Sequence, residues 1–162
     1  PLPLDRTNID RLWNRNRYDL RVFDPVAVPD DESKINDILA AVSESDYIII
    51  SSNRNYGPVG MLTATYPLTS LYYRALFDGD LGYDLVEGVT RYPRLGGTAM
   101  RSDPFLQAGM PWPRGLETIK PGDLRPGFAD ESFTVYDHPL VMVYHNSGGL
   151  SAEELRRKLL QR

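Results

Sequence analysis

The chain has 162 residues, of which 41% are hydrophobic and 25% are charged, and this composition indicates one globular domain rather than a disordered chain. The formal net charge of -4 argues against a nucleic-acid partner, because proteins that bind nucleic acids concentrate basic residues on one face. The absence of cysteine excludes disulfide bonds, thiolate zinc sites and a cysteine nucleophile.

The sequence shows no segment that could act as a membrane anchor. No apolar stretch reaches the roughly 20 residues that a helix needs to cross a bilayer, and no signal peptide is visible. The chain begins at Pro1 rather than at a methionine. We therefore expect a processed or excised chain, whose membrane part, if there is one, lies outside these residues.

The first part of the chain predicts a strand followed by a helix. Residues 1–17 are polar and irregular, whereas alternating character over residues 18–23 predicts a strand. The predicted helix covers residues 31–42, where Asp30 or Asp31 can cap the first turn and apolar residues recur at helical spacing.

Residues 47–50 give the strongest strand signal in the chain, a continuous run of one tyrosine and three isoleucines. Continuous rather than alternating apolarity indicates burial on both faces, as in the middle of a parallel sheet. The strand at 18–23, the helix and this strand would then form a βαβ unit, which is expected to be right-handed.

The middle of the chain predicts a helix at residues 69–77 and a strand at residues 83–89. Residues 94–127 follow as a long loop insertion that is rich in glycine and proline. Loops of this length are unusual inside a compact domain. Four apolar residues indicate that this loop packs against the rest of the protein: Phe105, Leu106, Met110 and Trp112.

The C-terminal part predicts two strands, at residues 133–136 and 140–144, and a last helix at residues 151–161 that begins with a Ser-x-x-Glu capping box. Together these elements predict a three-layer α/β fold with a mainly parallel central sheet and a C-terminal β-hairpin. We expect residues 1–162 to form a single soluble domain.

The loop that follows residues 47–50 is the first candidate site. In open α/β sheets, ligands bind outside the carboxyl ends of the strands, and hydroxyl, amide and guanidinium groups can hold a phosphate or a sugar. We predict Ser52, Asn53, Arg54 and Tyr56 as ligand-binding residues. The alternative is that Asn53 and Arg54 only fix the loop through bonds to nearby carbonyls and carboxylates.

Asp137 and His138 are the second candidate site. Adjacent residues in an extended segment point to opposite sides, so Asp137 could not orient the His138 ring for a hydrolase triad with Ser51 or Ser52, and no G-x-S-x-G motif is present. The alternative is a turn in which Asp137 accepts hydrogen bonds from backbone amides. We predict no catalytic residue, no metal site and no cofactor in this chain, since its two histidines lack the spacing of metal ligands.

Tyrosine is frequent, with ten residues in the chain. Five of them lie close together in the sequence and form either a sugar-stacking platform or ordinary core and rim positions: Tyr66, Tyr72, Tyr73, Tyr83 and Tyr92.

Several short motifs occur in an order that resembles a known family. Residues 46–54 (DYIIISSNR), with Tyr56-Gly57 behind them, resemble a DYIVLSSNR-YG segment. The following motifs come next, in this order: Tyr66-Pro67-Leu68-Thr69, Tyr72-Tyr73, Leu76-Phe77, Gly79, Leu81-Gly82-Tyr83, Tyr92-Pro93 and residues 131–139 (ESFTVYDHP). This order is similar to the C-terminal region of bacterial and archaeal multi-pass glycosyltransferases that use phospholipid carriers (the dolichyl-phosphate-mannose type, GT-C) and of their "YYY" membrane relatives.

The resemblance implies a location and a context. Such proteins use a polyprenyl-phosphate-linked sugar as donor, and their catalytic carboxylate lies in an early extracytoplasmic loop that this chain does not contain. The chain would then be a non-catalytic extracytoplasmic accessory domain. Its partners would be the remainder of the multi-pass membrane protein and either a polyprenyl-phosphate sugar or a glycan acceptor.

The chain also departs from this pattern. Where the relatives carry an Arg-Leu-Pro-Glu-Arg run, residues 61–65 are Met-Leu-Thr-Ala-Thr, so charges that would touch a phosphate are missing. Two alternatives therefore stay open. One is an interaction domain that binds a partner protein without any sugar chemistry. The other is a free-standing enzyme that binds a nucleotide or a sugar.

Overall fold

The computed structural model describes residues 19–117, 127, 129–130 and 132–161 of the chain. The predicted irregular segment at 1–17 lies outside the described residues. The helices are α2 (Glu32–Glu44), α3 (Tyr56–Met61), α4 (Pro67–Phe77), α5 (Pro104–Ala108), the π-helix η1 (Ser132–Asp137) and α6 (Ala152–Leu160). The strands are β1 (Tyr47–Ile50), β2 (Tyr83–Val89), β3 (Arg94–Leu95), β4 (Thr98–Ala99) and β5 (Val141–Asn146).

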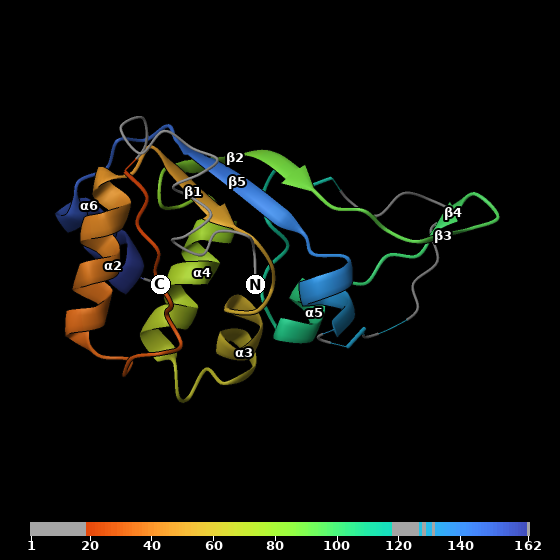
Figure 1. Ribbon diagram of the computed structural model, residues 1–162. Coiled ribbons are helices and arrows are strands. Elements are labelled where there is room, and N and C mark those ends of the chain that lie inside the picture. The colour runs from red at the N-terminus through yellow and green to blue at the C-terminus, as the bar shows by residue number, and fades with distance from the viewer. Residues whose placement is uncertain (1–18, 118–126, 128, 131, 162) are drawn as a thin grey trace.

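The main sheet is antiparallel. β5 lies in its centre between β1 and β2 and runs antiparallel to both (Figure 1). The predicted mainly parallel central sheet is therefore wrong. The first strand of the predicted βαβ unit does not form, because residues 19–23 take no strand conformation, and β1 pairs instead with a strand from the far end of the sequence.

β1 lies at an edge of the sheet and buries only one of its faces. Ile50 is 9% exposed, whereas Ile49 is 62% and Tyr47 is 56% exposed. Tyr47 contacts His145 on this outer face, with 5.0 Å between the ring centroids. The continuous apolar run of β1 was interpreted as burial on both faces, but the alternation of strand side chains exposes half of it.

The segment before β5 is a π-helix and not the predicted strand. Asp130 accepts a hydrogen bond from the Phe133 amide through its carboxylate (2.9 Å) and one from the Thr134 amide through its carbonyl (3.1 Å). The His138 amide donates to the Phe133 carbonyl at 2.8 Å. These local bonds use the backbone groups that a hairpin would need. The predicted C-terminal β-hairpin is wrong, and its second strand became β5.

The helices lie on one side of the main sheet, so the described part of the molecule has two layers and not three (Figure 1). Met142 and Tyr144 of β5 point into the core between the layers and are 0% and 1% exposed. The predicted helices at 31–42, 69–77 and 151–161 are confirmed as α2, α4 and α6. α6 begins with the predicted capping box, in which the Glu154 amide donates to the Ser151 hydroxyl at 3.3 Å.

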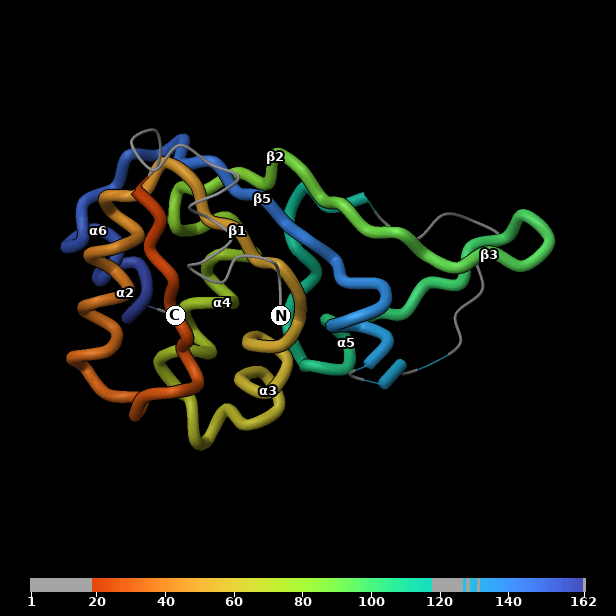
Figure 2. Tube along the Cα trace, in the orientation of Figure 1, coloured from red at the N-terminus to blue at the C-terminus, as the bar shows by residue number. Residues whose placement is uncertain are grey.

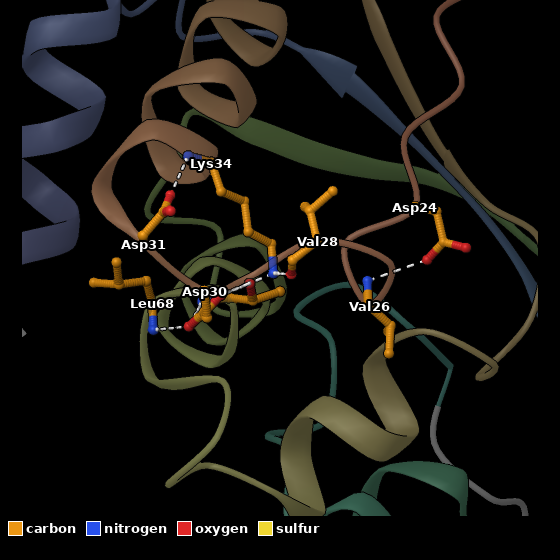
Figure 3. Close-up of polar contacts among 8 residues, drawn as sticks. Asp24, Val26, Val28, Asp30, Asp31, Lys34 and Leu68 are labelled. Carbon is orange, nitrogen blue, oxygen red and sulfur yellow. Dashed lines mark hydrogen bonds and ion pairs between the residues drawn. The ribbon is translucent and has the colours of Figure 1, made fainter.

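A buried ion pair joins the start of α2 to the start of α4 (Figure 3). Lys34 donates to Asp30 at 2.9 Å, and both side chains are nearly inaccessible, at 3% and 2% exposed. Asp30 also accepts hydrogen bonds from the amides of Leu68 (2.7 Å) and Thr69 (3.3 Å) and from the Thr69 hydroxyl. Burial by itself would raise the pKa of Asp30, but the hydrogen bonds from Thr69 and Lys34 hold it below its usual value. We call these four residues the Asp30 cluster.

The glycine-rich and proline-rich region packs on the protein around α5, whereas residues 94–97 of its β3–β4 hairpin are exposed and extend away from the body of the protein (Figure 1). It contains the short β3–β4 hairpin and α5. Phe105 of α5 is 1% exposed, and the ring of Trp112 contacts it with 5.2 Å between the ring centroids. The predicted packing is confirmed for Phe105, Trp112 and Met110, which is 6% exposed, but it is wrong for Leu106, which is 70% exposed.

Candidate functional site

The antiparallel register brings three chain segments to one end of the main sheet. Ile50, at the end of β1, pairs with Met142, and Val89, at the end of β2, pairs with Val141. The residues that follow β1 and β2 therefore lie beside those that precede β5. Figure 2 shows the chain leaving β1 toward α3 and entering β5 from η1 at this end of the sheet.

A small hollow of about 10 Å³ lies at this end of the sheet, which is about the space of one water molecule. Three of the six predicted site residues line it, namely Asn53, Tyr56 and His138. The remaining lining residues are Tyr92, Ser102, Pro104, Thr134 and Leu140. Three of the residues predicted for a site beyond β1 thus lie together, although the prediction assumed parallel strands and the sheet is antiparallel.

Tyr56 is held rigidly at the base of α3. Its side chain is 0% exposed, its ring stacks on Phe105 at 5.3 Å between centroids, and it meets Phe77 edge to face at 5.3 Å. Burial raises the pKa of Tyr56 well above its usual value, with smaller contributions from neighbouring groups. The hydroxyl therefore keeps its proton at physiological pH and acts as a hydrogen-bond donor.

The polar atoms of Asn53 and Tyr56 are buried without a hydrogen bond. Neither the Asn53 Oδ1 atom nor the Tyr56 hydroxyl has a hydrogen-bond partner within the part of the chain that the structure describes. A buried polar atom without a partner costs about 1–3 kcal/mol of stability. Such atoms beside a hollow indicate a place where a water or a ligand group completes the structure.

His138 is oriented by a backbone carbonyl. Its Nδ1 atom lies 2.5 Å from the Arg91 carbonyl oxygen, and its ring lies 4.6 Å from that of Phe133, measured between centroids. A carbonyl can only accept, so Nδ1 carries a hydrogen and donates it to Arg91. The Arg91 carbonyl takes the position at Nδ1 where a triad aspartate usually lies, and no carboxylate of the described residues is bonded to His138.

A larger hollow of about 110 Å³ lies next to the small one and shares Asn53, Pro104 and Thr134 with it. Its other lining residues are Arg54, Gly57, Pro58, Met61, Gln107, Ala108, Ala129 and Val135. Arg54 is exposed and is the one charged residue among those that line it. Its guanidinium forms no hydrogen bond or ion pair with the described residues.

The remaining two predicted site residues line neither hollow. The Ser52 hydroxyl accepts from the Arg54 amide at 3.4 Å and so shapes the loop. Asp137 is exposed at the end of η1. Of the six predicted residues, the structure thus places Asn53, Arg54, Tyr56 and His138 at the two hollows.

Sequence reasoning missed Tyr92, Ser102 and Thr134 as lining residues of the small hollow. They come from three separate parts of the chain, and no local motif links them. The tyrosine platform is also not formed, because Tyr72 and Tyr73 are buried in the core at 7% and 6% exposure. Tyr83 is buried as well, and its hydroxyl donates to the Val42 and Ser45 carbonyls at 2.7 Å.

The described residues contain no group of three or more histidine, aspartate and glutamate side chains that could hold a metal ion. None of the described helices combines the length and the apolar character that crossing a membrane requires. Comparison with protein-family models, with curated proteins and with solved structures gave no match. The resemblance to multi-pass glycosyltransferases therefore stays a prediction that depends on the order of short motifs.

Proposed function

We propose that this chain is a non-catalytic extracytoplasmic accessory domain of a membrane glycosyltransferase-like protein, and that the two hollows contact a glycan acceptor or a polyprenyl-phosphate sugar. One observation carries the binding part of this proposal: the Asn53 Oδ1 atom and the Tyr56 hydroxyl are buried beside a hollow without partners among the described residues. The glycosyltransferase context comes from the motif order alone.

The non-catalytic part of the proposal is supported by the chemistry at the site. Catalysis of acyl or glycosyl transfer needs a nucleophile or a pair of carboxylates that flank the reacting bond. The described residues that line the two hollows include no carboxylate and no oriented nucleophile–base pair. The polar groups of the two hollows are suited to binding and not to bond cleavage.

Titration of the chain with a soluble glycan and with a short-chain isoprenyl-phosphate sugar tests the binding. We expect chemical-shift changes at the amides around Asn53 and His138, and weaker binding for Asn53→Ala. Asn55→Ala is the matched control, because Asn55 lies in the same loop, makes no side-chain capping bond and lines neither hollow. Equal loss in both variants, or no binding of either compound, would remove the proposed site.

The gene upstream of Pro1 tests the context. We expect it to encode many hydrophobic spans, with an acidic residue in the first loop outside the membrane. A start codon directly before Pro1 would contradict the proposal and leave a free-standing domain.

An interaction domain is the second candidate, favoured by the outer face of the main sheet. Tyr47, Ile49, Val86 and Val89 expose between 53% and 62% of their surface there. Exposed apolar residues that gather on one face are typical of contact surfaces. A photo-crosslinker placed at Ile49 in cells would react with the partner or with the remainder of the parent protein. Reaction with solvent only would remove this candidate.

A further inference from the structure

In the small hollow, one hydrogen-bond acceptor and one donor have no partner among the described residues. Asn53 Oδ1 is a carbonyl oxygen and can only accept, whereas the protonated Tyr56 hydroxyl has a hydrogen to donate. A third polar group on the lining, the His138 ring, is held in place by the bond from its Nδ1 to the Arg91 carbonyl. The missing group must therefore both donate and accept.

The size of the hollow limits that group to one heavy atom. A volume of about 10 Å³ holds one water-sized oxygen and not a phosphate group. The walls cannot easily give way, because Tyr56 is fixed between aromatic rings and Thr134 is held by a hydrogen bond from its hydroxyl to the Asp130 carbonyl at 3.0 Å.

The charges at the site also disfavour a phosphate in the small hollow. Its lining, as far as the chain is described, contains no lysine or arginine, and the Arg101 guanidinium lies over the Tyr92 ring at 5.0 Å from the ring centroid. A phosphodiester offers acceptors only, so it would leave Asn53 Oδ1 without a donor and bring an unpaired charge into a poorly hydrated place. The exposed Arg54 belongs to the larger hollow.

We propose that the small hollow is a hydroxyl-recognition subsite, which takes one hydroxyl group of a neutral polyol such as a sugar ring and discriminates against phosphate. The hydroxyl donates to Asn53 Oδ1 and accepts from the Tyr56 hydroxyl, and the rest of the sugar lies toward the larger hollow. This inference names the ligand class of the function proposed above and rests on it.

The test compares three probes on the chain: a methyl glycoside, inorganic phosphate and a short-chain isoprenyl phosphate. We expect the glycoside to shift the amide signals around Asn53 and His138, and Tyr56→Phe to weaken its binding about fivefold to tenfold, as for the loss of one hydrogen bond. Asn55→Ala should bind as the parent does. Phenylalanine keeps the ring packing of Tyr56, so this variant is expected to fold.

The outcomes separate this inference from the proposed function. Isoprenyl phosphate binding that depends on Arg54, without glycoside binding, overturns the hydroxyl subsite and leaves the proposed function standing. Binding of none of the three probes, with only a water in the hollow of a crystal structure, overturns both. Glycoside binding that Tyr56→Phe leaves unchanged also overturns the subsite.

Discussion

The Asp30 cluster and the small hollow are two groups of buried polar side chains that differ in how completely they are bonded. Asp30 accepts from two amides, a hydroxyl and a buried ammonium group. In the small hollow, Asn53 Oδ1 and the Tyr56 hydroxyl have no such partner among the described residues. Buried polar side chains that bond fully to one another hold the fold together. Buried polar atoms without a partner in the protein need a water or a ligand group to form their hydrogen bonds. This difference, and not polarity as such, is the reason for proposing the small hollow and not the Asp30 cluster as a binding site.

The largest effect is expected from breaking the complete cluster with Asp30→Ala. The substitution leaves the Lys34 charge buried without its partner and also removes the cap of α4, so we expect a loss of about 3–5 kcal/mol in the free energy of unfolding. Urea denaturation measures this loss.

Asp19→Ala is the control for this prediction. Asp19 pairs with Arg21 on the surface, and its side chain is 80% exposed. Exposed pairs contribute little, so we expect a change within about 0.5 kcal/mol. If Asp19→Ala costs as much as Asp30→Ala, the Asp30 cluster has no special structural role.

The next largest effect is expected where α3 and α5, which carry residues of the small hollow, pack against each other. α3, which carries Tyr56, packs against α5 through Gly60, where a Cβ atom would lie 2.1 Å from the Ala108 carbonyl oxygen. Gly60→Ala must therefore push the two helices apart, and we expect it to lower the free energy of unfolding by about 1–3 kcal/mol. The same change at Gly57 of this helix meets nothing closer than Asn53 Nδ2 at 4.0 Å.

Gly57→Ala is thus the matched control, and we expect no loss or a gain of up to about 1 kcal/mol from the higher helix propensity of alanine. Thermal unfolding of both variants measures the difference. Equal melting temperatures for the two would contradict the close contact of α3 with α5.

Local signals predicted the positions of several helices and strands, but not how they are arranged. The Asp31 cap of α2, the capping box of α6 and the range of β2 follow from side chains within a few residues of each other. Strand direction does not follow from such signals. The apolar run of β1 is compatible with an edge strand as well as with a central one, and only the pairing with β5 decides between them.

The site could be predicted in part for a related reason. Asn53 and Tyr56 lie directly after β1, so any sheet with this strand presents them at its end. His138 joins them because β5 runs antiparallel to β1, which the sequence did not indicate. Ser102 and Thr134 reach the hollow only through the packing of α5 and η1, and that packing has no sequence motif.

The smallest effect on stability is expected from replacing a buried tyrosine by phenylalanine, at Tyr83, whose hydroxyl has partners, and at Tyr56, whose hydroxyl has none among the described residues. Tyr83 and Tyr56 are both buried, but the Tyr83 hydroxyl donates to the Val42 and Ser45 carbonyls. Tyr83→Phe removes the donor to those carbonyls, and we expect it to lower the free energy of unfolding by about 1 kcal/mol. Tyr56→Phe removes a hydroxyl without a described partner, so the unliganded chain should keep or gain stability. A larger loss for Tyr56→Phe than for Tyr83→Phe in urea denaturation would mean that the Tyr56 hydroxyl already has a partner within the folded chain, and the small hollow would then have no unmet donor to offer a ligand.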